Sequence, residues 1–456
     1  MKIFIPEEIK YIISTLEESG YKAYIVGGCV RDTIMGREPK DYDVTTDATP
    51  DVTSEIFSAD KVIDTGSKHG TVTVIHNGVH VEVTTFRKES VYSDGRHPDS
   101  VVFSDSIEED LSRRDFTLNA MAYNDSEGIV DPFGGRGDIE KRIIRTVGEP
   151  RERFNEDSLR MLRALRFSSE LCFDIEEKTE AAIFERKNDI ETRISKERIQ
   201  KELEGILTGD DVEKVLRKYA DVVGVAIPEI IPMIGFDQKS PYHIYDVWEH
   251  TIRVVGGSPN NSVSRFAALF HDIGKPSCFS QGEDGVGHFF GHPEVSYEMA
   301  DCIMRRLKFD NATRQDVLTL VRWHDVRPEV TEKSVRRAIM KVTPELFDSW
   351  VAITRADNGA QSPSLSGRLE KIAAIEEMGH RLIEEEGALS LRTLNIKGGD
   401  IMSLGVVEGP EVGRIMNILL EEVLEERLAN DREELMSRAE SLAKKGLKNS
   451  HSYGKI

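Results

Sequence analysis

The sequence predicts an α/β domain over residues 1–145, followed by a chain that is almost entirely helical. In the first part, short runs rich in β-branched and aromatic residues alternate with helical segments. An Asn77-Gly78 pair between two such runs is a hairpin signal. From about residue 150 onwards, long stretches of Glu, Lys, Arg, Leu and Ile repeat with helical periodicity.

The sequence also predicts where the strands of the first part and the loops of the second part lie. The strands expected in the first domain are, in order, 23–28, 41–46, 61–66, 70–78 and 79–86. Segments that break the helical remainder, and therefore predict loops, are 258–261, 280–287 and 357–366.

Composition limits the classes of protein. A length of 456 residues exceeds one ordinary domain, so we expect about two to four. The net charge of −21 argues against general coating of nucleic acid and against an anionic membrane surface, so specific RNA binding would need a local basic patch. Four cysteines without a CxxC spacing are typical of reduced thiols, and neither a secretory leader nor a long apolar run is apparent. We expect a cytoplasmic protein without membrane contact.

The stretch YIVGGCVRDTIMGREPKDYDVTT suggests phosphate and metal chemistry. Gly28 lies between an apolar strand and a helix, where backbone N–H groups can approach a phosphate, and Arg31 offers a planar guanidinium. Asp41 and Asp43, two residues apart in a predicted strand, would point to one face and suit a pair of Mg²⁺ ions. The alternative interpretation is an ordinary turn followed by the solvated face of an edge strand.

Further polar residues of the first domain extend this group. Glu82, in the predicted strand VHVEVTTF, is a candidate third carboxylate, or an ordinary outward-facing strand residue. In RRDFTLNA, Arg114 and Asn119 could reach a triphosphate or a ribose. The alternative is a helix start that Asp115 caps and whose arginines are solvated.

The stretch EDSLRMLRALRF predicts an amphipathic helix. Asp157, Arg160, Arg163 and Arg166 follow one another at intervals of three, so adjacent members are neighbours on one surface. Apolar residues occupy much of the opposite side. The pattern fits either a functional polar ridge or an ordinary salt-bridged helix face.

These motifs resemble those of the polymerase-β-like nucleotidyltransferases, in the class that holds bacterial CCA-adding enzymes and poly(A) polymerases. The resemblance rests on GGCVRD with DYDVTTDATP, then EEDLSRRDFTLNAMAYN, VDPFGGRGDI and ERFNEDSLRMLRALRF, in that order. It implies a polymerase-β-like α/β nucleotidyltransferase head in which Asp41 and Asp43 are catalytic and hold Mg²⁺, while Gly28, Arg31 and Arg114 bind the triphosphate. The implied partners are tRNA, CTP and ATP.

The same resemblance implies that Asp157 and Arg160 select the incoming base. Cytosine and adenine each present an amino donor beside a ring acceptor, which a carboxylate and a guanidinium together satisfy. Uracil and guanine would set acceptor against acceptor, and each buried unpaired group costs about 1–3 kcal/mol. Arg163 and Arg166 resemble further nucleotide contacts of the class.

The segment 84–103 bears on which nucleotides are added. Its polar middle predicts a mobile loop rather than a strand pair. In the class, a full-length loop here accompanies the change from adding C to adding A, so we expect complete CCA addition. A CC-only or A-only adder and a poly(A) polymerase remain alternatives.

A second group of residues predicts a metal centre. His250, His271, Asp272 and Asp357 match the H…HD…D pattern of HD-superfamily metal phosphohydrolases. Imidazole nitrogen and carboxylate oxygen together suit a divalent transition metal. Further residues that could add a second metal or meet a phosphate are His292, His324 and Lys275. The alternatives are an HD phosphohydrolase whose head only binds nucleotides, and an HD-derived scaffold without activity.

The resemblance also implies a division of the chain. We expect a nucleotidyltransferase head over 1–145, a helical neck with the base-selecting helix over 146–220, an HD domain over 221–365, and a helical region over 366–456 that binds tRNA by shape and phosphate contacts.

Overall fold

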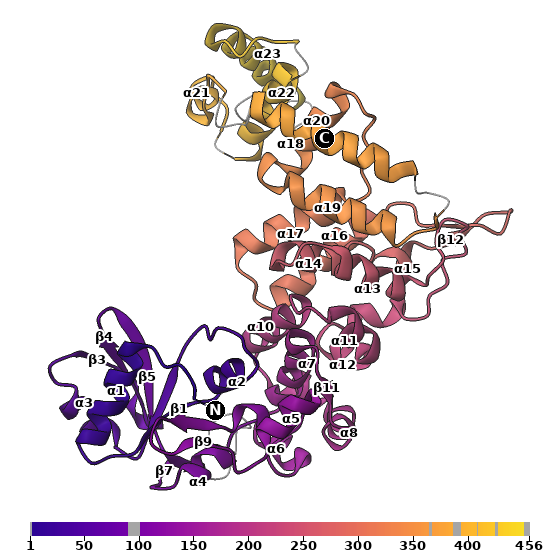
Figure 1. The fold of residues 1–456 in the computed structure, drawn as a ribbon. Helices are drawn as coiled ribbons and strands as arrows, with labels where there is room; N and C mark the ends of the chain where they lie inside the picture. The colour runs from indigo at the N-terminus through magenta and orange to yellow at the C-terminus, as the bar shows by residue number, and fades with distance from the viewer. Residues whose placement is uncertain are drawn as a thin grey trace. The chain divides into compact units, whose positions relative to one another are not determined.

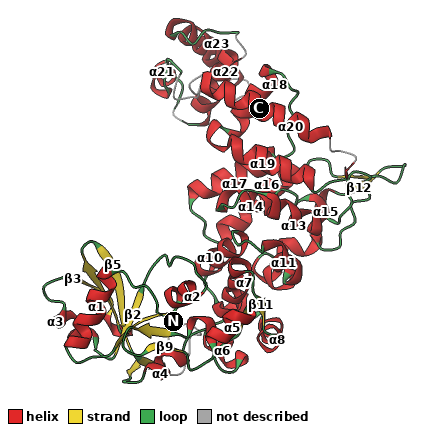
Figure 2. Cartoon of the chain, in the orientation of Figure 1, coloured by secondary structure: helices red, strands yellow, loops and turns green. Residues whose placement is uncertain are grey.

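The computed structural model describes residues 2–89, 101–363, 367–385, 394–407, 409–424 and 427–450. The chain forms two compact units (Figure 1), one comprising Met1–Ile234 with Cys302–Asp310 and the other comprising Gly235–Asp301 with Asn311–Ile456. Figure 2 shows that the sheet belongs to the N-terminal part and that helices make up nearly all of the rest. The expected fold class, an α/β head followed by helices, is confirmed.

The head is built on a seven-stranded mixed sheet in the order β3-β4-β5-β2-β1-β8-β9. Its strands are β1 (Ala23–Val26), β2 (Asp43–Thr46), β3 (Lys61–Gly66), β4 (Thr71–His76), β5 (Val79–Thr85), β8 (Ala122–Asn124) and β9 (Gly128–Val130). The helices along this part of the chain are α1 (Glu7–Glu18), α2 (Gly28–Ile34), α3 (Pro50–Ile56), α4 (Ile107–Ser112) and α5 (Gly135–Lys141). All residues of β1 are buried, as expected of a strand between two neighbours.

The predicted hairpin is confirmed between β4 and β5. Asn77 and Gly78 both adopt positive φ, 49° and 83°, which a two-residue hairpin turn requires. The strands pair antiparallel from His76 with Val79 back to Thr71 with Thr84.

One local expectation was wrong. Strand β2 begins only at Asp43, so Asp41 precedes the strand instead of lying within it. The two ends of the segment 84–103 pair with each other as β6 (Arg87–Glu89) and β7 (Val101–Phe103). The middle of that segment, 90–100, lies outside the described residues.

The first unit continues in short helices. They are α6 (Pro150–Glu156), α7 (Leu159–Leu171), α8 (Glu177–Arg186), α9 (Asp189–Arg193), α10 (Lys196–Leu207), α11 (Val212–Lys218) and α12 (Ala220–Ala226), and a two-stranded parallel sheet joins β10 (Ile143–Ile144) to β11 (Asp174–Ile175). Helix α7 packs on α10, and ten of its thirteen residues are buried.

The second unit is helical apart from the small hairpin β12 (Ser280–Gln281) and β13 (Gly287–His288). Its helices are α13 (Val247–Gly257), α14 (Ser262–Phe270), α15 (Lys275–Cys278), α16 (His292–Arg306, which runs on into the first unit), α17 (Asn311–Trp323), α18 (Glu332–Val342), α19 (Phe347–Gly359), α20 (Gly367–Glu385), α21 (Gly398–Ser403), α22 (Pro410–Leu424) and α23 (Arg432–Ser450). A separate apolar cluster holds α21, α22 and α23 together. Within the described residues, no helix combines the length and apolar character that crossing a bilayer demands.

Candidate active sites

A cavity of about 710 Å³ opens beside β1, β2 and α7 in the first unit, and we call it the head cavity. Its lining includes Phe167 and most residues predicted for the head: Gly28, Arg31, Asp41, Asp43, Arg114, Asp115, Asn119, Arg163 and Arg166. The tertiary structure therefore brings together residues that lie as many as 139 positions apart in the chain, from Gly28 to Phe167.

The Gly27-Gly28 pair allows close approach at one wall of the head cavity. Gly27 has a φ of 83°, and a Cβ atom there would lie 2.9 Å from Nη1 of Arg114. A larger residue would therefore be strained and would also push the guanidinium aside. Gly28 begins α2, and Gly27 alone separates it from β1, so the strand ends two residues earlier than the expected 23–28.

Three carboxylates gather at the edge of the head cavity. Asp43 opens β2 and pairs in parallel register with Glu82 on β5, while Asp41 lines the cavity from the segment before β2. Desolvation by the cavity walls, opposed by Arg114 and reinforced by Asp41 and Glu82, raises the pKa of Asp43 to about 6. Carboxylate oxygens that repel one another in this way fit a hard divalent cation, which removes the repulsion.

Asp115 organises the opposite wall of the head cavity. Its buried carboxylate lies 2.6 Å from Arg163 and accepts a backbone N–H bond of 2.8 Å. Burial alone would raise the pKa of Asp115, but Arg163 and Arg160 outweigh it and hold the pKa at about 2. Asn119 donates to Asp115 at 3.3 Å and accepts a 2.8 Å bond from Arg31. The two arginines of this wall are thus held in place by neutral or anionic partners.

The sequence did not single out Phe167, whose ring lies close to three arginines of the head cavity. Guanidinium carbons of Arg166, Arg31 and Arg163 lie 4.7, 5.3 and 5.3 Å from the centre of its ring. Each contact is worth about 0.5–1 kcal/mol at a partly exposed site. Phe167 follows Arg166 directly on α7, so an aromatic residue beside the arginine ridge was the available signal. Three cations around one ring suit a polyanionic ligand.

Asp157 and Arg160 lie outside the lining of the head cavity. Asp157 is not on a helix, contrary to expectation: its extended backbone separates α6 from α7, because its carboxylate accepts the Leu159 N–H at 3.0 Å and pairs with Arg198 at 2.6 Å. Arg160 is buried on α7, where it pairs with Glu156 at 2.6 Å.

Electrostatics nevertheless connect this pair to the head cavity. Burial would lower the pKa of Arg163, but Asp115 first, then Glu202, and more weakly Asp157 outweigh it and raise that pKa. Arg160 in turn helps to lower the pKa of Asp115. A change of partner at Asp157 or Arg160 would therefore be felt at the cavity wall.

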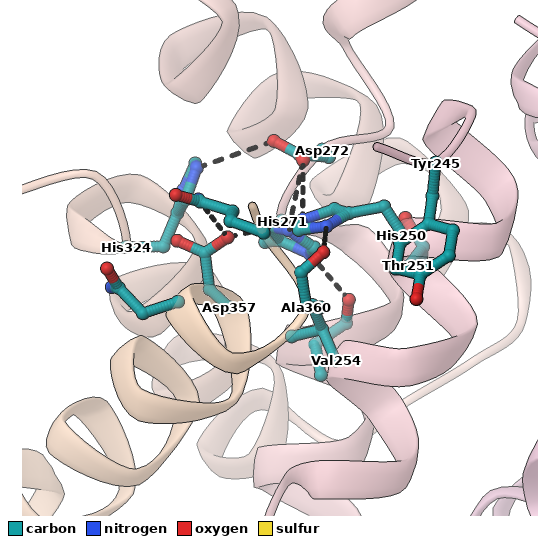
Figure 3. Close-up of polar contacts among 12 residues, drawn as sticks. Tyr245, His250, Thr251, Val254, His271, Asp272, His324, Asp357 and Ala360 are labelled. Atoms are coloured by element: carbon teal, nitrogen blue, oxygen red, sulfur yellow. Dashed lines mark hydrogen bonds and ion pairs between the residues drawn. The ribbon is translucent and has the colours of Figure 1, made fainter. Parts of the chain in front are cut away.

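The four predicted HD residues meet in the second unit (Figure 3). His250 lies on α13, His271 and Asp272 follow α14, and Asp357 lies near the end of α19. Nε2 of His250 lies 3.2 Å from Asp357 Oδ1 and 3.5 Å from Asp272 Oδ2, and Nε2 of His271 lies 3.1 Å from the same Oδ2. All four side chains are buried.

His292 and His324 form a matching group on the other oxygen of Asp272. Their Nε2 atoms lie 3.3 and 3.7 Å from Asp272 Oδ1 and 3.1 Å from each other. The ligand atoms of His250, His271 and Asp272 lie within 4.8 Å of one another, and so do those of Asp272, His292 and His324. Asp272 thus stands between two groups of possible metal ligands.

The histidine tautomers fit metal binding. In every one of the four histidines the Nδ1 atom faces a backbone carbonyl, which can only accept, so Nδ1 carries the proton. The bonds run from His250 to Ala360 at 3.3 Å, His271 to Ala268 at 2.7 Å, His292 to Phe289 at 2.9 Å and His324 to Val321 at 2.6 Å. The Nε2 lone pairs are left facing one another and the carboxylates. Such a concentration of acceptors fits divalent cations, and backbone carbonyls orient the ligands.

Cationic side chains surround this centre. Lys275 is buried and lies 2.7 Å from Asp272 and 2.9 Å from Gln238, while Arg327 pairs with Asp357 at 2.8 Å. Burial alone would raise the pKa of Asp272, but His271, where its ring is protonated, and Lys275 hold that pKa well below its usual range. A cavity of about 350 Å³, the HD cavity, is lined by Asp272, Lys275, Arg327 and Asp357 together with His271, His292 and His324. Gln238 and Arg327 had no sequence signal, because neither belongs to the H…HD…D pattern.

Comparisons with known proteins match the parts of the chain that contain the two cavities. The sequence matches the families described as poly A polymerase head domain over residues 23–145, probable RNA and SrmB binding site of polymerase A over 172–222, and HD domain over 242–348. It is 33% identical over 443 residues to a CCA-adding enzyme of Limosilactobacillus fermentum, covering 96% of this chain and 97% of that protein. It is 34% identical over 430 residues to one of Bacillus cytotoxicus, covering 92% and 95%.

A solved structure is similar along the whole chain. The Bacillus stearothermophilus CCA-adding enzyme, in complex with CTP, superposes with a TM-score of 0.69 at 31% identity, covering 98% of this chain and 100% of that chain.

Proposed function

This chain belongs to the CCA-adding enzymes, and we infer from the head cavity that it adds C and A nucleotides to the 3′ end of tRNA from CTP and ATP without a nucleic-acid template. The observation that supports this assignment of residues is that Asp41 and Asp43 line the same cavity as the arginines around Phe167, with Glu82 paired in register beside Asp43. A carboxylate edge facing a cationic wall suits a triphosphate that arrives with divalent cations.

In the proposed reaction the 3′-hydroxyl oxygen of tRNA attacks the α-phosphorus of the nucleotide. A new ester bond forms, the bond to the bridging oxygen breaks, and pyrophosphate leaves with the electron pair. Divalent cations would lower the pKa of the attacking hydroxyl and neutralise the leaving oxygens. We assign Mg²⁺, because Asp41 and Asp43 offer oxygen ligands alone. Arg31, Arg114 and Gly28 bind the triphosphate, and Arg163 and Arg166 extend that surface.

Base selection is assigned to Asp157 and Arg160. In the nucleotide-free chain their polar groups are occupied by Arg198 and Glu156. A cytosine or adenine edge would exchange these contacts for a carboxylate acceptor and a guanidinium donor. The helical C-terminal region, 366–456, is proposed to hold tRNA by shape and phosphate contacts.

Nucleotide incorporation tests this function directly. Three tRNAs, lacking the whole CCA end, its last two nucleotides or only the terminal A, are incubated with labelled CTP or ATP. A CCA-adding enzyme extends all three to the complete end. Addition of C to the first two tRNAs without the terminal A would identify a CC-only adder. Extension of the third tRNA alone would identify an A-only adder, and growth beyond the complete end would indicate a poly(A) polymerase.

A second function, phosphohydrolysis at the HD cavity, is favoured by the placement of Asp272 between two pairs of histidines. A water oxygen would attack a phosphoester phosphorus, and the alcohol would leave after taking a proton. Divalent transition metals would supply the activated water and polarise the phosphate. Lys275 and Arg327 lie beside the carboxylates, where they can contact phosphate oxygens. The substrates that fit a tRNA enzyme are terminal or 2′,3′-cyclic phosphates at RNA ends.

Hydrolysis of bis(p-nitrophenyl) phosphate in the presence of Mn²⁺, Co²⁺ or Ni²⁺ measures this activity without any nucleotide. His271→Ala should abolish it and leave CTP incorporation unchanged. A His271→Ala protein that hydrolyses the ester like the parent protein would refute the assignment to the HD cavity.

A further inference from the structure

A second cavity adjoins the HD cavity, and we call it the side cavity. It has a volume of about 390 Å³, within the range of small-molecule pockets. Four residues line both cavities: His243, Asp325, Arg327 and Gln361. A ligand could therefore occupy both at once, with one part beside the metal ligands and another in the side cavity.

Helix α19 presents unpaired polar atoms on its side of this cavity. Thr354 and Asn358 lie one helical turn apart and line the cavity, and they are 4% and 7% exposed. Oγ1 of Thr354 and Oδ1 of Asn358 have no hydrogen-bond partner within the described part of the chain. The amide nitrogen of Asn358 already donates to the Thr354 carbonyl at 2.9 Å, so its oxygen is the atom left over. Buried polar groups without partners are rare in proteins and suggest a missing ligand or water.

One part of the remaining wall is apolar and includes Val326, Trp350, Val351, Ile372 and Ile375, whereas charged side chains line the rest: Asp325, Arg327, Glu329, Arg368 and Lys371. An apolar wall beside a free amide oxygen and a free hydroxyl suits a flat heteroaromatic ring that carries an amino group beside a ring nitrogen. The amide oxygen would accept from the amino group, and the hydroxyl would donate to the ring nitrogen.

We propose that the side cavity seats the adenine or cytosine base of a nucleotide whose phosphate lies in the HD cavity. This inference rests on the proposed phosphohydrolase function and names its substrate class: phosphate esters of nucleosides with an amino-bearing base. Uracil would set its carbonyl O4 against Asn358 Oδ1 and its N3–H against the hydroxyl, which can still accept, so it would lose the amide contact. These bases are also the ones found at a tRNA 3′ end under construction.

Hydrogen bonds join the two cavities across α19. Arg368, in the side cavity, donates to Gln361 at 3.3 Å, and Gln361 donates to the metal-ligand candidate Asp357 at 2.9 Å. Arg327 lies at the border and reaches the other oxygen of Asp357 at 2.8 Å. A base that fills the side cavity would therefore rest against groups that hold a ligand of the metal centre.

The test compares substrates with and without a base. For 2′,3′-cyclic AMP, Asn358→Leu should lower kcat/KM about 10- to 100-fold, mainly through KM, as expected when a buried polar contact is lost. Hydrolysis of bis(p-nitrophenyl) phosphate by the same variant should stay within about twofold of the parent value, since this ester has no base. Thr354→Val, which keeps the shape of the side chain, should act in the same direction.

A binding measurement without metal completes the test. Calorimetric titration of the metal-free protein with adenosine 2′-monophosphate should show weaker binding in Asn358→Leu, and the difference between the two proteins excludes any contribution of the head cavity. Gln315→Leu serves as the matched variant, because Gln315 is an exposed amide residue of α17 that lines neither cavity.

The outcomes separate the two proposals. Values of kcat/KM and binding in Asn358→Leu equal to those of the parent protein, or an equal loss in Gln315→Leu, would overturn the base seat while leaving the phosphohydrolase function in place. Absence of hydrolysis of both esters by the parent protein would overturn the function, and the titration would then decide the seat by itself. Thermal melting of each variant, compared with that of the parent, identifies any change caused by misfolding.

Discussion

The two candidate metal sites of this chain are built on opposite electrostatic plans. In the head, Asp43 lies close to two other acids, and its pKa is raised to about 6. In the HD cavity, Asp272 is completely buried among histidines and Lys275, and its pKa is held well below the usual range. The head offers carboxylate oxygens alone, whereas the HD cavity offers imidazole nitrogens with oriented lone pairs.

This difference indicates two ways of using a metal. The carboxylates of the head repel one another until a cation binds, which suits cations that enter with each triphosphate and leave with pyrophosphate. The HD ligands are held by backbone carbonyls and stay in place without help, which suits a resident ion. This interpretation of the two sites would be wrong if one site depended on the other, or if their metal preferences did not differ.

The largest expected effect is on nucleotide transfer. Asp41→Ala should lower CTP incorporation into tRNA by about 10³-fold or more, because the metals lose a ligand at the point where charge develops. Hydrolysis at the HD cavity should not change. Asp51→Asn, an exposed acid in the first turn of α3, is the control and should incorporate CTP normally. An active Asp41→Ala protein would remove the basis for the head assignment.

Metal content of the HD centre should respond next. His324→Ala should reduce tightly bound Mn²⁺ from two ions to about one, because only the Oδ1 side of Asp272 loses a ligand. Asp272→Asn should reduce it to nearly none, since Asp272 serves both sides. Elemental analysis after exhaustive dialysis measures the stoichiometry, and circular dichroism checks the fold. Equal metal content in both variants would contradict a shared aspartate.

Base choice in the head should change more modestly. Asp157→Ala should reduce discrimination against UTP about 10- to 100-fold, because one mismatched buried contact is worth about 1–3 kcal/mol. The KM for CTP should change less than the UTP/CTP ratio of kcat/KM. Glu197→Ala, an exposed acid in the first turn of α10, is the control. If the ratio is the same in Asp157→Ala and in the parent protein, base selection lies elsewhere.

The smallest effect is a pH-dependent change in stability. The pKa of Asp43 is about 6 in the folded chain and about 3.9 in an unfolded one, so folding favours its protonated form. The stability that the folded chain gains from protonated Asp43 is fully present below about pH 4 and is lost as the pH rises through 6. Asp43→Asn should therefore raise the Tm of the metal-free protein by about 1–3 °C at pH 8, and by less at pH 5. A lower Tm at pH 8 would mean that Asp43 is stabilised by its neighbours.

The positions of most strands and helices could be predicted from the sequence. The strand runs and the helical remainder follow from periods of two and 3.6 residues, and the hairpin turn follows from the Asn77-Gly78 pair, so each signal acts within one element or turn. The order of the motifs indicated the family, and the H…HD…D spacing indicated four candidate metal ligands. The strand, turn and helix signals can be recognised in short windows of the chain, whereas the motif order and the spacing from His250 to Asp357 were recognised by their resemblance to known families.

Which of the candidate site residues contact one another could be seen only in the tertiary structure. Asp41 left the strand and Asp157 left the helix, because hydrogen bonds and ion pairs at element ends outweigh a periodic pattern. The ring of Phe167 gathered three arginines, and His292 and His324 found the second oxygen of Asp272, through packing between elements distant in sequence. Such contacts depend on how whole elements pack against one another, and no short stretch of residues encodes that packing by its own period.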